Sequence, residues 1–184
     1  MPFIETGFPG LKVFEPKIFA DNRGYFFETF NENTFNEAGI DSRFVQDNES
    51  KSQYGVVRGL HYQLNPFAQA KLVRVINGEV LDAVVDIRRG SPTYGQKYEI
   101  LLTGENKRQL FIPRGFAHGF SVLKDETVFC YKCDNIYNKE SEGGILLTDP
   151  AVNIDWQVPA DKMLLSGKDL ANPQFKDCRN NFDF

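Results

Sequence analysis

The chain has 184 residues, enough for a substantial core, and we predict one domain over residues 1–184. Its 25 acidic residues slightly outnumber its 21 basic residues, and the basic residues are dispersed, which argues against nucleic-acid binding. Because the sequence contains neither a long uncharged apolar segment nor a charged leader followed by an apolar run, we expect a cytoplasmic protein without membrane partners.

Short runs of β-branched and aromatic residues, separated by Gly, Pro and Asn, predict an all-β protein. We expect strands at residues 11–15, 25–30, 44–49, 56–63, 71–76, 79–87, 96–103, 109–112, 118–123, 127–134 and 145–147. Helix is scarce, although residues 31–39 offer a capping residue and a terminating glycine for about two turns. Many short strands must hide their edges, and a jelly-roll barrel or closed sandwich achieves this.

The clearest turn signal in the chain is Asn77-Gly78, which separates the expected strands 71–76 and 79–87. Asn-Gly suits the positive φ angles of a tight two-residue turn. We therefore predict a β-hairpin at this point.

Three cysteines occur, at Cys130, Cys133 and Cys178, and the first two form a C-x-x-C pattern. Residues three apart on a strand point to opposite faces, so this pair would not readily share a disulfide or a metal. A redox motif would also require the start of a helix. We predict reduced thiols that serve packing.

Only two histidines are present, and His61 lies close to three cations, Arg58, Lys71 and Arg74, on sequence typical of strands. One interpretation is a core histidine that a backbone carbonyl satisfies. Buried cations are rare unless they are paired or used, so the cluster favours a functional site.

The spacing of these residues resembles the cupin superfamily of small barrels. Gly55, His61 and Gly78 fit its first motif, and residues 113–118 fit the Pro-x-Gly-x-x-His of its second motif. Metal-binding cupins carry His-x-His and a glutamate where this chain has His-Tyr-Gln and Lys71. With two histidines and an ammonium near the ligand position, we predict that the metal site is lost.

The residues that replace the metal ligands suit proton abstraction next to a carbonyl. Neutral His61 can accept a proton near neutral pH, and Lys71 can stabilise a developing oxyanion. Tyr131 shares a strand face with Phe129 and Cys133, so its hydroxyl could enter the same barrel as a proton donor. The alternative for Tyr131 is packing in the core or at the rim.

Over nearly its whole length, the sequence resembles the dTDP-4-dehydrorhamnose 3,5-epimerases of rhamnose biosynthesis. The matching segments are residues 21–28, 46–48, 58–63, 112–120 and 166–169. The resemblance implies a cofactor-free isomerase that inverts both carbons next to the ketone of a dTDP-linked 4-keto-6-deoxy sugar. His61 would be the base, and Asp169 would hold it. Lys71 would stabilise the enolate, and Tyr131 would return the proton from the opposite face.

The same resemblance assigns to the nucleotide-sugar Arg23, Glu28, Gln46, Asn48, Arg58, His118, Glu142 and Lys168. It assigns Tyr137 to stacking on the thymine base. Arginines and a lysine match a diphosphate, and an aromatic plane matches a base. Strict alternation puts Arg58 and His61 on opposite faces, so Gly59 must bend or bulge the strand if both line the pocket.

A homodimer is also implied, in which N-terminal strands contribute to the partner's site, and residues 25–30 are apolar enough for such an interface. Three alternatives remain open. They are an epimerase that inverts one carbon or accepts a related nucleotide-linked 4-keto sugar, a metal-dependent cupin isomerase or dioxygenase, and a non-catalytic carbohydrate-binding jelly roll.

Overall fold

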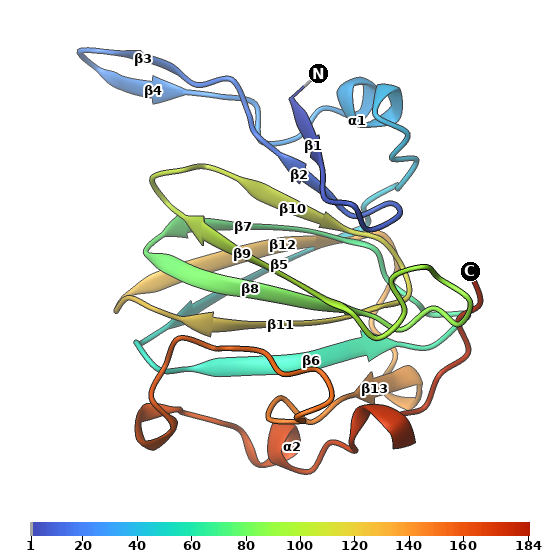
Figure 1. Cartoon of the computed structure of the whole chain (residues 1–184). Helices are drawn as coiled ribbons and strands as arrows, with labels where there is room; N and C mark the ends of the chain where they lie inside the picture. The colour runs from blue at the N-terminus through green and yellow to red at the C-terminus, as the bar shows by residue number, and fades with distance from the viewer. Residues whose placement is uncertain (1) are drawn as a thin grey trace.

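The computed structural model describes residues 2–184, and its main feature is a pair of antiparallel β-sheets that face one another (Figure 1). The six-stranded sheet has the order β1 (Phe3–Glu5), β2 (Lys12–Phe14), β10 (Gln109–Ile112), β7 (Lys71–Asn77), β12 (Thr127–Cys133) and β5 (Gln46–Ser52). The five-stranded sheet has the order β13 (Glu142–Gly144), β6 (Val57–Gln63), β11 (Phe116–Val122), β8 (Glu79–Asp86) and β9 (Lys97–Thr103). The predicted all-β jelly roll is confirmed.

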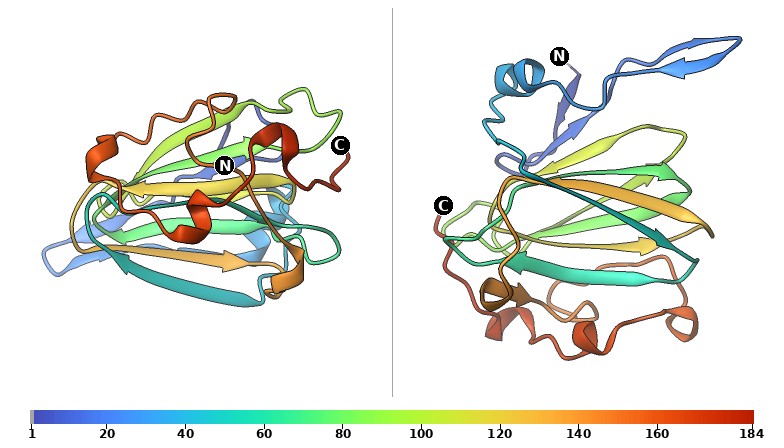
Figure 2. Two further views of the ribbon diagram at one scale, coloured as in Figure 1. Left: turned by 90° about the horizontal axis from the view of Figure 1, so that it is seen from below. Right: turned by 180° about the vertical axis from the view of Figure 1, so that it is seen from behind.

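A separate two-stranded arm, β3 (Phe19–Asp21) and β4 (Gly24–Phe26), projects from the barrel (Figures 1 and 2). Lys107, between β9 and β10, donates a hydrogen bond to the Tyr25 hydroxyl at 3.0 Å. The helices are short: α1 (Glu32–Glu37), α2 (Gly167–Leu170) and three 3₁₀ turns at Lys139–Ser141, Ala160–Lys162 and Phe175–Asp177. The chain after β13 runs along the outside of the five-stranded sheet (Figure 1). None of the helices in residues 2–184 has the length and apolar character needed to span a membrane.

Apolar side chains fill the space between the sheets and cover the outer face of each one. The interior cluster contains Val73, Val75, Val80, Val84, Leu110, Phe120 and Phe129, among others. Ala83 and Val85 of β8 belong instead to the cluster beneath the chain's last third. Strand β8 is therefore buried on both faces, which explains its nearly continuous apolar sequence.

Helix α1 forms where the capping signal predicts it. The Asn31 side chain accepts a hydrogen bond from the Thr34 amide at 3.3 Å, and this satisfies one of the free amides of the first turn. Phe35 of α1 is buried against Phe3 and Phe14 on the outer face of the six-stranded sheet. The helix thus covers part of that face.

The predicted hairpin at Asn77-Gly78 is wrong, because β7 and β8 lie in different sheets. Gly78 has a φ of +85°, whereas Asn77 is not among the residues with positive φ, so the two-residue hairpin turn does not form. A Cβ on Gly78 would lie 2.1 Å from the Thr127 Oγ1 atom. The glycine therefore makes a corner at which the chain passes from one sheet to the other.

Several predicted boundaries also differ from the structure. Strand β13 lies at Glu142–Gly144 instead of 145–147, where Ile145 and Leu147 are apolar because they pack beneath the five-stranded sheet. The strand expected at 25–30 ends at Phe26, and the remaining residues lead to α1. The three-residue strands β1 and β3 were not predicted.

The three cysteines are free thiols, as predicted. Cys133 is buried, and its Sγ atom is 3.8 Å from the Asn48 amide nitrogen. Cys130 is half-buried and lies next to Glu49. The two thiols therefore occupy different surroundings on β12, in agreement with strand alternation.

Candidate active site

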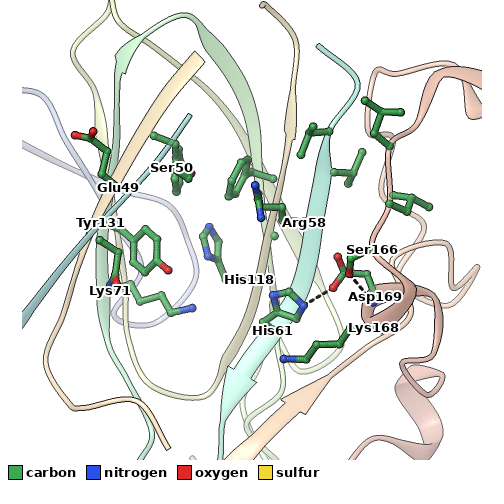
Figure 3. A pocket seen from close by; sticks show the side chains of 18 residues that line it. Glu49, Ser50, Arg58, His61, Lys71, His118, Tyr131, Ser166, Lys168 and Asp169 are labelled. Carbon is green, nitrogen blue, oxygen red and sulfur yellow. Dashed lines mark hydrogen bonds and ion pairs between the residues drawn. The ribbon is translucent and has the colours of Figure 1, made fainter. Parts of the chain in front are cut away.

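A cavity of about 660 Å³ lies between the sheets, and eight of the predicted site residues line it (Figure 3). They are Asn48, Arg58, His61, Lys71, His118, Tyr131, Lys168 and Asp169. A second cavity of about 370 Å³ shares five of these residues and adds Gln46, Tyr137 and Glu142. The two cavities form one cleft, in which nearly all the predicted site residues meet.

His61 and Asp169 form a close pair on the wall of the cleft. The His61 Nε2 atom is 2.5 Å from the Asp169 Oδ1 atom, although 108 residues separate them in the sequence. Asp169 is buried on α2, whose first turn is capped by the Ser166 hydroxyl accepting from the Asp169 amide at 3.1 Å. The sequence predicts only a turn at this segment, and the short helix is what aims the carboxylate at the imidazole.

The surroundings of His61 favour its neutral form. Burial lowers the pKa of the imidazole, the Asp169 carboxylate opposes this shift, and the ammonium groups of Lys71 and Lys168 lower the pKa further. A neutral imidazole can accept a proton, and Asp169 can stabilise the imidazolium that forms.

A bulge in β6 lets Arg58 and His61 line the same cavity, as their predicted roles require. In the pairing of β6 with β11, Phe120 lies opposite Arg58 and His118 lies opposite His61, so β6 carries one extra residue. Gly59 permits the bulge, because it has a φ of +140° and a Cβ there would lie 2.6 Å from the Gly119 Cα atom.

Lys71 and Tyr131 come from the six-stranded sheet and face His61 of the five-stranded sheet across the cavity (Figure 3). The Lys71 Nζ atom lies 5.8 Å from the centre of the Tyr131 ring. Within residues 2–184, Lys71 makes no direct ion pair. Burial lowers the pKa of Lys71 and raises the pKa of Tyr131, so the phenol keeps its proton at neutral pH.

A second histidine–aspartate pair lies deeper in the barrel. The His118 Nε2 atom is 3.1 and 2.9 Å from the two carboxylate oxygens of Asp82, which is fully buried on β8. Our sequence interpretation did not include Asp82. The available signal was a single carboxylate inside the apolar run from Val80 to Val85.

Polar groups at the rim of the cleft are already paired with one another. The Lys168 Nζ atom lies 2.7 Å from the Glu142 Oε1 atom, and Gln46 donates to Asn48 at 2.9 Å. Tyr137 lines the second cavity and is 56% exposed, so its ring is accessible at this rim.

Arg23 and Glu28 are the two predicted site residues that do not line either cavity. Arg23 lies on the projecting arm, where its side chain is 86% exposed and pairs with Asp21 at 2.5 Å. Glu28 follows the arm and accepts a hydrogen bond from Asn31 at 3.1 Å. One copy of the chain does not bring these two residues to His61.

The acidic, histidine and cysteine side chains are the candidate metal ligands of this protein. Within residues 2–184, these side chains form no group of three or more that could hold a metal ion. His61 and His118 each have one carboxylate neighbour instead.

Comparison with known proteins gives a consistent result along the chain. The sequence profile of the dTDP-4-dehydrorhamnose 3,5-epimerase family matches residues 5–177. A Shigella flexneri dTDP-4-dehydrorhamnose 3,5-epimerase is 54% identical over 178 residues, which cover 96% of this chain and 97% of that protein.

Solved structures agree with the sequence matches. The dTDP-4-dehydrorhamnose 3,5-epimerase of Elizabethkingia anophelis is 51% identical with a TM-score of 0.92, covering 95% of this chain and 96% of that one. The Legionella pneumophila dTDP-6-deoxy-D-glucose-3,5-epimerase, in complex with dTDP-4-keto-L-rhamnose, is 50% identical with a TM-score of 0.91, covering 95% and 93%.

Fold and site together define a cupin-like jelly roll whose barrel encloses a histidine, a lysine and a tyrosine around one cavity. Within that class, the chain belongs to the dTDP-4-dehydrorhamnose 3,5-epimerase family.

Proposed function

We propose that the protein is an isomerase that converts dTDP-4-dehydro-6-deoxy-D-glucose to dTDP-4-dehydro-L-rhamnose in dTDP-rhamnose biosynthesis. It inverts the two carbons that flank the C4 ketone, and it uses neither a metal nor an organic cofactor. The observation that carries the proposal is the cavity in which His61 and Tyr131 approach from opposite sheets, with Lys71 beside them.

Each inversion proceeds through an enolate. His61 removes the proton from the carbon next to the ketone, and the electrons of that bond form a carbon–carbon double bond while the C4 oxygen becomes negative. The Lys71 ammonium stabilises this oxyanion. Tyr131 then delivers its phenolic proton to the opposite face of the same carbon. Exchange with water returns a proton to Tyr131 and removes one from His61.

The remaining predicted residues bind the nucleotide-sugar. In the proposed complex, Arg58 and Lys168 bind the diphosphate, and Tyr137 stacks on thymine. The other polar contacts come from Gln46, Asn48, His118 and Glu142, all of which line the cleft. Because Lys168 is paired with Glu142, the diphosphate must compete with that carboxylate.

We further propose a homodimer in which the arm of each subunit reaches the partner's cleft. Phe19, Tyr25 and Phe26 of the arm are 54%, 59% and 66% exposed. So much exposed aromatic surface is unusual, and a two-stranded hairpin has no core of its own to stabilise it. A partner surface that covers these aromatics would bring Arg23 and Glu28 to a nucleotide.

Proton NMR in deuterated water tests the reaction. With dTDP-4-keto-6-deoxy-glucose, the wild-type protein should exchange the protons at both C3 and C5 and form the inverted sugar. Exchange at one carbon only would instead identify a single-carbon epimerase. Inactivation by a chelator, with rescue by one divalent metal, would support a metal-dependent cupin enzyme, and binding without exchange would support a carbohydrate-binding module.

Two variants separate the roles of the base and the acid. His61→Ala should lower exchange by about 10²- to 10⁴-fold, because the proton acceptor is lost, while binding of dTDP is kept. Tyr131→Phe should still exchange protons but should form less inverted product, because His61 returns the proton to the original face. Equal losses of exchange and inversion in Tyr131→Phe would contradict the donor role.

A further inference from the structure

Asp82 is a buried carboxylate that the proposed reaction does not use. It lies on β8 between Val80 and Val84, which belong to the interior core cluster, and its side chain is 0% exposed. Burying an isolated carboxylate among apolar side chains is costly unless other charges or hydrogen bonds compensate it. Asp82 does not line the cavity, so any influence on a ligand must act through its neighbours.

His118 is the direct neighbour of Asp82. Its Nε2 atom lies 3.1 and 2.9 Å from the two Asp82 oxygens, and its ring lines the cavity. Because Asp82 occupies Nε2, the ring nitrogen left for a ligand is Nδ1. Asp82 thereby fixes which nitrogen His118 presents to the cavity.

Lys71 is the other basic residue near Asp82. Burial lowers the pKa of the Lys71 ammonium, whereas Cys133 and Asp82 oppose that shift. Burial likewise raises the pKa of Asp82, and His118 and Lys71 oppose that shift. The charged or titratable side chains that line the same cavities as Lys71 are Glu49, Arg58, His61, Tyr62, His118, Tyr131, Cys133, Tyr137, Glu142, Lys168 and Asp169. Asp82 is the carboxylate that raises the pKa of Lys71.

The neighbouring carboxylate on the same strand shows the contrast. Asp86 is also 0% exposed, but its oxygens accept hydrogen bonds from the side chains of Arg88, Ser91 and Thr93 at 2.6 to 2.9 Å. Those contacts explain Asp86 as a structural residue at the end of β8. Within residues 2–184, Asp82 has no arginine partner, and its two basic neighbours, His118 and Lys71, both line the cavity.

We propose that Asp82 is a positioning residue that serves as the counter-ion of the sugar site, keeping Lys71 protonated and the Nδ1 atom of His118 directed into the cavity. The role of Asp82 in catalysis rests on the proposed function. The charge coupling between Asp82 and Lys71 does not depend on that function.

The direct test is the titration of Lys71 in the ligand-free protein. The ¹³C shift of the lysine ε-carbon, assigned by comparison with Lys71→Arg, is followed against pH in wild-type protein and in Asp82→Asn. Loss of the nearby negative charge should lower the Lys71 midpoint by about one pH unit or more. Asp86→Asn is the matched control, because it removes a buried carboxylate from the same strand and should leave that midpoint in place.

A midpoint in Asp82→Asn that equals the wild-type value would overturn the proposal. Should circular dichroism show that Asp82→Asn is unfolded, the reciprocal measurement decides. Lys71→Met should raise the midpoint of the Asp82 carboxyl, read from its ¹³C shift, because the coupling acts equally on both groups. An unchanged Asp82 midpoint in Lys71→Met would also overturn the proposal.

Turnover supplies the functional readout. Lys71 loses its charge as the pH rises through its pKa, so the alkaline limb of the kcat profile should move to lower pH in Asp82→Asn and stay in place in Asp86→Asn. If the Lys71 midpoint moves in Asp82→Asn but the alkaline limb of the kcat profile stays in place, the role of Asp82 in the sugar site is overturned. If the wild-type protein catalyses no exchange, the proposed function fails, whereas the lysine titration still tests the charge coupling.

Discussion

The two histidines of the chain each face an aspartate, but their surroundings differ. The His61 side chain is 38% exposed toward the cleft, whereas the His118 side chain is 8% exposed. A proton acceptor must exchange its proton with water after each turnover, so the more open pair suits the base. The enclosed pair suits a fixed contact with the substrate.

Replacing Asp169 tests the support that His61 receives. His61 acts as a base only when neutral, so activity falls as the pH falls through its pKa. Because the Asp169 carboxylate raises that pKa, Asp169→Asn should move the acid limb of kcat/KM to lower pH. Turnover at neutral pH should fall by about 10²- to 10⁴-fold, since the imidazolium and the ring orientation lose their support.

The pH profile of proton exchange in deuterated water measures both effects in Asp169→Asn. Asp149→Asn is a suitable control, because Asp149 is buried at 3% exposure in the same C-terminal third but accepts hydrogen bonds only from backbone amides. An acid limb that stays in place in Asp169→Asn would contradict the direct pairing with His61.

At the scale of elements, the bulge in β6 decides whether Arg58 and His61 serve one cavity. A methyl group at Gly59 would meet the Gly119 backbone at 2.6 Å and would require an unfavourable φ. Gly59→Ala should therefore destabilise the fold by about 2 kcal/mol and lower activity more than stability alone explains. Chemical denaturation followed by exchange kinetics measures the two losses.

Gly24→Ala is the matched comparison for stability. Gly24 has a similar φ of +131°, but nothing lies within 4 Å of its added Cβ. Gly24→Ala should therefore cost less stability than Gly59→Ala. Equal costs for the two variants would mean that the contact with Gly119 does not matter.

The sequence predicts the long strands well because most of them are runs rich in β-branched and aromatic residues, bounded by turn residues. Strands β6 to β12 all lie close to their predicted ranges, and α1 begins at its predicted cap. The three-residue strands β1 and β3 escape prediction because so short a segment carries too little alternation to identify it.

Local sequence patterns do not predict contacts between distant segments of the chain. The dipeptide Asn-Gly suits both a hairpin turn and a corner between two sheets. The packing of Thr127 against Gly78, a contact between distant residues, distinguishes the corner from the hairpin. Residues 166–169 likewise carry no local sign of their approach to His61. The family resemblance supplied the pairing of Asp169 with His61, and the geometry of α2 explains it.

On the scale of the whole molecule, the β3–β4 arm belongs to neither sheet of the barrel, so its role lies outside its own barrel. If each arm completes the partner's cleft, one site contains His61 of one subunit and Arg23 of the other. Arg23→Ala and His61→Ala then remove residues that different subunits contribute to the same site. Mixing the two inactive variants should then restore activity, because a mixed dimer contains one site with both residues intact. Random subunit exchange predicts roughly a quarter of the wild-type activity.

The rate at which inverted product forms, before and after a mild unfolding and refolding step, measures the recovery. Mixing His61→Ala with Tyr131→Phe provides the control, since both residues belong to the same barrel and neither mixed site is intact. Activity that merely averages the two variants in the Arg23 experiment would show that the arm serves its own subunit.

The long separation between His61 and Asp169 has a consequence for biosynthesis. A second long-range contact holds strand β6. The Tyr62 hydroxyl donates to the Arg179 carbonyl at 2.5 Å, across 117 residues of sequence. Both partners leave the ribosome long after β6 does, and contacts of such long range form late in folding. A nascent chain that has completed its barrel strands therefore still lacks a working dyad. Catalytic competence is acquired only when the last part of the chain has been translated and has docked.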